Sequence, residues 1–94
     1  MFKQIIDAVS QHFDITYEEM HNSKTRERAF VLPRQVGHYF LHKKTKLTLS
    51  EIGKKIGGKD HATVLHSCKT IRNLIQTDRD FAKEIEEIES NINY

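Results

Sequence analysis

The chain has little of what would tie it to a membrane, a disulfide framework or a flexible linker. Its 94 residues include one proline, four glycines and one cysteine, with no low-complexity stretch. The lone Cys68 excludes an internal disulfide framework. No apolar run approaches the ~18 residues that a membrane span requires, and the start lacks a signal-peptide pattern. These absences predict one small, soluble, cytoplasmic domain over residues 1–94, with a single core.

Positive charge is concentrated in the middle of the chain, although the net charge is only +2. Between residues 24 and 72, 12 lysines and arginines stand against three acids, Glu27, Glu51 and Asp60. The flanking segments carry net charges of −3 and −4. Solvated helix faces more often mix both signs, so a basic middle between acidic ends favours a surface that meets the phosphates of nucleic acid.

Apolar residues recur at helical spacing nearly everywhere, and no segment alternates as a strand would. The first stripe predicts a helix over roughly residues 2–13. A short helical turn is expected at 17–21, with Thr16 as a possible N-cap. The predicted fold class is therefore all-α.

Residues 22–29, NSKTRERA, carry charge without apolar periodicity and are predicted to form a basic loop. Pro33 suits the first turn of the next helix, where its missing N–H is harmless. That helix is expected to end near Lys44. Its predicted buried stripe is Leu32, Val36, Tyr39 and Phe40.

The stretch LSEIGKKIGGKDHATVL, followed by His66, describes a short helix, a glycine turn and a second helix. Thr48 and Glu51 match the capping-box pattern, which predicts a short helix over about 49–56. Gly57 and Gly58 can supply the positive φ angles that a tight turn needs. This order is typical of a helix-turn-helix.

Asp60 is expected to cap the second helix of this motif. Its predicted core positions are Val64, Leu65, Cys68, Ile71 and Ile75. A last helix is expected after Thr77. Its apolar stripe, interpreted as core packing rather than a coiled-coil seam, is Phe81, Ile85, Ile88 and Ile92.

A recognition helix presents its N-terminal turn to base edges, and in this chain that turn spans Lys59 to Thr63. Asp60 can accept from a cytosine amine, and His61 and Thr63 can bond base edges. A methyl group of Ala62 or Thr63 can pack on a thymine methyl. The alternative for Asp60 is a purely capping role, and for Thr63 that of an ordinary first-turn residue.

The residues KDHATVLH, in the larger frame LSEIGKKIGGKDHATVLHSCKTI, resemble the signature of the C-terminal DNA-binding domain of DnaA, the bacterial chromosomal replication initiator. The resemblance covers nearly the whole chain and includes the PRQ of Pro33, Arg34 and Gln35. It implies a compact all-helical domain with a helix-turn-helix, of TrpR-like type. It also implies binding to the short asymmetric DnaA box, of TTATNCACA type.

The same resemblance implies roles for individual residues. Asp60, His61 and Thr63 match recognition-helix contacts. Lys59 and His66 match neighbouring DNA contacts. Arg26 matches the arginine of the basic loop that enters the minor groove. Further backbone or peripheral contacts are implied for Arg28, Arg34, Gln35, Ser50 and Lys55. Ala62 stands where many members have threonine, which keeps a methyl for thymine but removes a hydroxyl.

The resemblance does not extend to an ATP-binding module, because no G-x-x-x-x-G-K-[ST] pattern occurs in these 94 residues. The chain is interpreted as an excised initiator domain or a stand-alone relative. His38 and His42 share a helix face but lack a third metal ligand. Cys68 and His66 are two residues apart and point away from each other, so they are no catalytic pair. We expect no metal, cofactor or catalytic residue.

The sequence therefore predicts a non-enzymatic domain that binds double-stranded DNA sequence-specifically, as in origin recognition for replication initiation, at the nucleoid. One alternative is a regulator or mobile-element protein that reuses this domain. Another is a protein-interaction module whose acidic C-terminal helix docks a partner. One monomer per site is expected, because the loop from Lys24 to Arg28 can read the adjacent groove and no apolar stripe is left for a dimer interface.

Overall fold

The computed structural model describes residues 1–22 and 27–92, which form helices and no strand. The helices are α1 (Phe2–Phe13), α2 (Tyr17–Asn22), α3 (Arg28–Lys44), α4 (Leu49–Lys55), α5 (His61–Thr77) and α6 (Arg79–Ser90). The all-α prediction is confirmed. Among these described helices, none is both long and apolar enough to cross a membrane.

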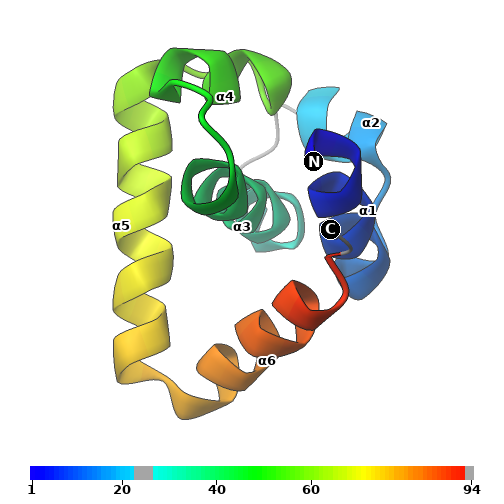
Figure 1. The fold of residues 1–94 in the computed structure, drawn as a ribbon, viewed down its shortest axis with the longest axis vertical. Coiled ribbons are helices and arrows are strands. Elements are labelled where there is room, and N and C mark those ends of the chain that lie inside the picture. Colours follow the sequence, from blue (N-terminus) through cyan, green and yellow to red (C-terminus); the bar gives the residue numbers. More distant parts are fainter. Residues whose placement is uncertain (23–26, 93–94) are drawn as a thin grey trace.

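Helix α3 runs through the middle of the molecule and the other helices pack around it (Figure 1). Helix α5 lies along one side, with α4 at one of its ends and α6 at the other, while α1 and α2 cover the opposite side (Figure 1). Val36, Phe40 and Leu41 of α3 are fully buried. Burying one such side chain contributes roughly 1.5–3 kcal/mol, so the stripe of α3 ties the surrounding helices into one core.

Most predicted core positions are buried. The fully or almost fully buried ones are Ile5, Ile6, Val9, Val36, Phe40, Ile52, Ile56, Val64, Cys68, Ile71, Phe81, Ile85, Ile88 and Ile92. Leu32, Tyr39, Leu49 and Ile75 are partly buried and pack against that cluster. Helical periodicity therefore identified most of the core.

Helices α1 and α2 begin and end close to the predicted residues. Thr16 is the predicted N-cap of α2: the Glu19 N–H donates to its hydroxyl at 3.0 Å. The Thr16 N–H donates in return to a Glu19 carboxylate oxygen at 3.1 Å. This reciprocal pair satisfies two backbone donors that the helix itself leaves unpaired, so a helix of only six residues is defined at its start.

The predicted start of α3 is wrong. The helix begins at Arg28, and Pro33 lies inside it rather than in its first turn. The N–H groups of Phe30 and Val31 both bond to the Glu27 carbonyl at 3.0 Å, so a regular turn forms before the proline. Phe30 also packs against the core. Pro33 offers no N–H to the Ala29 carbonyl and its ring crowds that carbonyl, and the packing of Phe30 offsets this cost.

The prediction that Leu65 lies in the core is also wrong, since 37% of its surface is exposed. Helix α5 directs one narrow stripe at α3. Ser67, rather than Leu65, is buried beside that stripe. Its hydroxyl lies 3.0 Å from Nδ1 of the buried His38. The side of α5 that carries Leu65 therefore faces solvent.

Candidate nucleic-acid interface

Helix α4 begins with the predicted capping box. The Glu51 N–H donates to the Thr48 hydroxyl at 3.1 Å, and the Thr48 N–H donates to the Glu51 carboxylate at 2.8 Å. The bonds from Thr48 lower the pKa of Glu51, so the carboxylate stays charged at the positive end of the helix dipole. Lys54 and Lys55 occupy the last turn, where cations are favourable. The first helix of the motif is thus fixed at both ends.

The turn after α4 depends on three glycines. Gly57 and Gly58 have φ angles of 88° and 59°, as their position in the sequence predicts. Gly53 lies under the turn: a Cβ there would come within 2.0 Å of the Lys59 carbonyl oxygen. The Lys59 N–H donates to the Gly53 carbonyl at 2.9 Å. A side chain at position 53 would therefore push the turn away from α4.

The role of Gly53 was not predicted from the sequence. The signal in the sequence was a glycine inside a short capped helix. Glycine destabilises a helix relative to alanine, so its presence there indicates a position where a side chain would not fit.

Helix α5 begins with the predicted cap. The Thr63 N–H donates to the Asp60 carboxylate at 2.9 Å. That bond lowers the pKa of Asp60, so the side chain is an anion that accepts hydrogen bonds. Asp60, His61, Ala62 and Thr63 are all exposed, while the core side of α5 begins at the next residue. A ligand can therefore reach the first turn of α5 without any rearrangement of the core.

The buried His38 connects α3 with both helices of the motif. Its Nε2 lies 2.9 Å from the Ile56 carbonyl oxygen, and its Nδ1 lies 3.0 Å from the Ser67 hydroxyl. Burial lowers the pKa of His38 to about 4, so the ring is neutral near pH 7. His42, its neighbour one turn along, is exposed. The two histidines predicted to share a helix face therefore lie in different environments, one in the core and one in solvent.

The other residues singled out from the sequence lie in different environments. Ser50, Lys55 and His66 are exposed around the motif, and Lys59 is half-buried in the turn. At the start of α3, Arg28 is exposed, and Gln35 lies half-buried two turns later. Arg26 and its neighbours, residues 23–25, lie outside the described residues.

Arg34 differs from these residues because it is only 6% exposed. Its Nε donates to the Met20 carbonyl at 3.0 Å, and its side chain passes close to Gly57. The desolvation of the guanidinium lowers its pKa, but an arginine stays charged near neutral pH. This placement favours a structural role for Arg34 beside the turn, and direct DNA contact by it stays a prediction.

Acidic residues gather away from the motif. Helix α6 carries Asp80, Glu84, Glu86 and Glu87 on exposed positions and lies at the end of α5 remote from the turn (Figure 1). Glu89 is paired with Lys44 at 2.8 Å. The exposed α6 acids therefore lie far from the first turn of α5.

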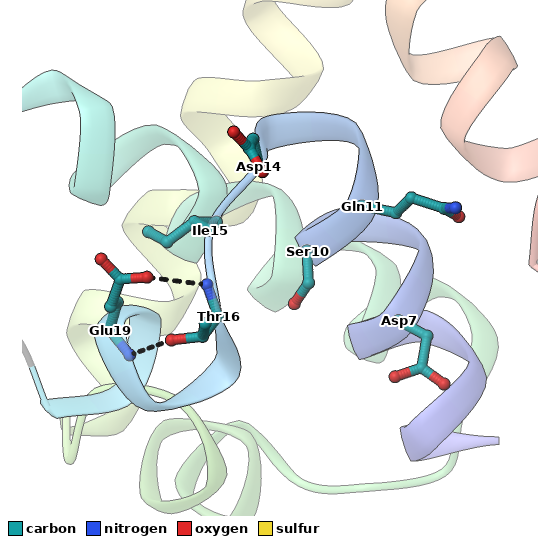
Figure 2. A pocket seen from close by; sticks show the side chains of 7 residues that line it. All are labelled: Asp7, Ser10, Gln11, Asp14, Ile15, Thr16 and Glu19. Carbon is teal, nitrogen blue, oxygen red and sulfur yellow. Dashed lines mark hydrogen bonds between the residues drawn. The ribbon is translucent and has the colours of Figure 1, made fainter.

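A hollow lies between α1 and α2. Figure 2 shows its lining residues, Asp7, Ser10, Gln11, Asp14, Ile15, Thr16 and Glu19. Three carboxylates border it, and Glu19 is already engaged by Thr16. This lining is unsuited to phosphate, and none of the predicted DNA-binding residues belongs to it.

A family model described as the bacterial dnaA protein helix-turn-helix matches residues 2–71. The chain belongs to this family. The match includes α4, the glycine turn and the first part of α5, and it confirms the resemblance found in the sequence.

Curated relatives carry the name chromosomal replication initiator protein DnaA. The relative from Bacteroides thetaiotaomicron is 44% identical over 86 residues, which are 92% of this chain and 18% of that protein. The relative from Flavobacterium psychrophilum is 44% identical over 85 residues, which are 90% and 18% of the two chains. That from the Wolbachia of Brugia malayi is 42% identical over 85 residues, again 90% and 18%. The chain thus spans less than a fifth of the length of these DnaA relatives.

Proposed function

We propose that the chain binds double-stranded DNA sequence-specifically through α4, the glycine turn and α5, as the DNA-binding part of a replication initiator. One observation carries the proposal: the bacterial dnaA helix-turn-helix family covers residues 2–71, and the first turn of α5 within that match is exposed. The named relatives are chromosomal replication initiators, which supplies the biological role.

The first turn of α5 would enter the major groove. Asp60 uses one carboxylate oxygen to cap the helix, and a carboxylate keeps further lone pairs that can accept from a cytosine amine. His61 and Thr63 offer hydrogen-bonding groups to base edges, and Ala62 offers a methyl to thymine. All four residues are exposed, so base reading would not compete with core packing.

Backbone contacts would set the register of that helix on the duplex. Lys59 lies in the turn just before α5, and His66 lies one helical turn after the base-reading residues. Ser50 and Lys55 lie at the start and end of α4. Hydrogen bonds and charges of this kind hold the protein on phosphates without reading sequence.

The basic segment that leads into α3 would supply the second contact. Arg28 and Gln35 of α3 would reach the DNA backbone, and Arg26 would enter the minor groove. An arginine gains most in a narrow A/T-rich groove, where the negative potential is deepest. Two different reading elements in one protomer suit an asymmetric site such as a DnaA box.

One protomer would bind each box. The apolar stripes of the six helices pack into one core, and among the described residues only Met1 and Leu65 are exposed large apolar side chains. That leaves too little apolar surface for a stable dimer interface. In analytical ultracentrifugation with a single-box duplex, a one-to-one complex is expected, and a two-to-one complex at saturation would contradict this stoichiometry.

The whole of residues 1–94 would act as a single, non-catalytic domain. Helix α6 lies beyond the matched residues, yet it packs against α5 and α1 and contributes Phe81, Ile85 and Ile88 to the common core. Binding to chromosomal DNA would place the protein at the nucleoid in the cytoplasm.

An electrophoretic mobility shift tests the function most simply. The protein is titrated against a DnaA-box duplex and a scrambled duplex of the same composition, at fixed salt. Tighter binding to the box is expected. Equal binding to both would reduce the function to that of a generic basic domain, and no binding even at low salt would favour a protein-interaction module built on α6.

A further inference from the structure

Side chains from outside the helix-turn-helix hold three consecutive backbone positions of its turn. The Tyr17 hydroxyl donates to the Lys55 carbonyl at 2.5 Å. The Ile56 carbonyl accepts from the ring of His38, as described above. The Gly57 N–H donates to Nδ1 of His21 at 3.0 Å. The two residues in each contact are far apart in the sequence, by 38, 18 and 36 positions respectively, so all three contacts depend on the tertiary fold.

Tyr17 and His21 form a pair of rings on α2. They lie one helical turn apart and stack with centroids 5.3 Å apart and an interplanar angle of 14°. The Tyr17 ring also packs edge to face with Phe2 of α1, with centroids 5.9 Å apart. Each ring therefore has a packing partner that limits its rotation.

Helix α2 is anchored to α3 and does not depend on its own length for stability. At six residues it would not persist as an isolated helix. Its Met20 is fully buried, and the Met20 carbonyl accepts from the buried Arg34. The helix that carries the two rings is thus fixed to the core.

The turn needs such external support. Gly57 and Gly58 have little intrinsic preference between conformations, because they lack a Cβ. The last carbonyls of α4 have no partner within the helix, and water could satisfy them in many turn geometries. Hydrogen bonds between these backbone groups and fixed side chains select one geometry, and that geometry sets the direction of α5.

We propose that Tyr17 and His21 are positioning residues for DNA recognition: they hold the turn in the conformation that presents Lys59 and the first turn of α5 to the duplex. The inference rests on the proposed function. Neither side chain needs to contact DNA. They hold the turn already in the free protein. The effect is measured as affinity for the box duplex and as discrimination between box and scrambled duplexes.

Single-group substitutions test this role. Tyr17→Phe keeps the ring and removes the hydroxyl that reaches Lys55. His21→Ala removes the acceptor for Gly57, whereas His21→Asn places an amide oxygen close to where Nδ1 stood. Two matched controls are Tyr39→Phe, whose hydroxyl has no hydrogen bond within the described part of the chain, and His42→Asn at an exposed position of α3.

Affinity for a DnaA-box duplex is measured at a temperature well below every melting transition, so that each protein is folded. Tyr17→Phe and His21→Ala should each weaken box binding about fivefold, the equivalent of one ordinary hydrogen bond. Binding to a scrambled duplex should change less. His21→Asn should recover most of the loss, and both controls should bind as the wild type does.

Hydrogen exchange of the Gly57 amide provides a readout that needs no DNA. The amide should be protected in the wild type and in His21→Asn, and should exchange faster in His21→Ala. Wild-type affinity in both Tyr17→Phe and His21→Ala would overturn the positioning role even if their melting temperatures fell. If the wild type itself does not prefer the box, the proposed function has failed instead.

Discussion

Nε2 of His38 lies 2.9 Å from the carbonyl oxygen of Ile56 at the end of α4. A carbonyl only accepts, so Nε2 carries the hydrogen of the neutral ring and Nδ1 accepts from the Ser67 hydroxyl. One neutral imidazole thereby joins α3 to both helices of the DNA-binding motif. A second proton on Nδ1 would reverse the hydrogen bond with Ser67, because the hydroxyl would then have to accept, and would leave a charge in the core.

This arrangement predicts a loss of stability in mild acid. Burial, opposed by the hydrogen bond to Ile56 and reinforced by Arg34 and Lys59, lowers the pKa of His38 from 6.5 to about 4. Above pH 6.5 the ring is neutral in the folded and the unfolded chain, so its contribution to the free energy of unfolding is fully present. Between pH 6.5 and about 4 only the unfolded chain binds the proton, so the free energy of unfolding falls as the pH falls.

The fall should level off below about pH 4 and amount to at most about 3 kcal/mol. Urea denaturation between pH 7 and pH 4 measures it. His38→Gln serves as the comparison, because its stability should depend less on pH over this interval. The same pH dependence in both proteins would mean that His38 is not the group responsible.

Asp60→Ser separates the capping role of Asp60 from its proposed base contact. Serine is as good an N-cap as aspartate, but it lacks the second carboxylate oxygen that is proposed to accept from a cytosine amine. Melting temperature should change little, while affinity for the box should fall roughly tenfold. Asp60→Ala should also lower the melting temperature, by about 4–8 °C. Unchanged box affinity in Asp60→Ser would leave Asp60 with capping alone.

Lys59→Ala should weaken binding to box and scrambled duplexes about equally, because a lysine meets phosphate as a point charge. Removing one phosphate contact should flatten the dependence of log K on log salt by roughly 0.9. The measurement is a salt series of binding isotherms on both duplexes. An unchanged slope combined with lost discrimination would assign Lys59 to base reading instead.

His61→Ala should have the opposite pattern. Affinity for the box should fall by ~1–3 kcal/mol while binding to the scrambled duplex stays nearly intact. Since His61 is exposed, the melting temperature should barely move. Calorimetry and binding on one preparation check both quantities. A fall of several degrees in melting temperature would indicate that the side chain stabilises the fold.

Features that depend on neighbouring residues were predictable from the sequence. The start of α4 depends on Thr48 and Glu51, three positions apart, and both predicted bonds are present. The cap of α5 depends on Asp60 and the amide of Thr63 in the same way. The positive φ angles of Gly57 and Gly58 follow from the turn that these caps enclose.

Features that depend on helix packing were not predictable. The early start of α3 follows from the packing of Phe30, and the exposure of Leu65 follows from the direction in which α5 lies on α3. Gly53 matters because the Lys59 carbonyl passes over it. The role of His38 was not predicted, because its partners Ile56 and Ser67 lie 18 and 29 positions away in the sequence. The DNA contacts themselves stay predictions until a duplex is bound.

A nuclear magnetic resonance titration with a single-box duplex tests the central claim most directly. Backbone amide resonances are followed over the whole chain as DNA is added, with a scrambled duplex as the reference. The account predicts that the largest box-specific changes fall on residues 59–66, with little change on α6 (Arg79–Ser90). Changes concentrated on α6, with residues 59–66 unaffected, would contradict it.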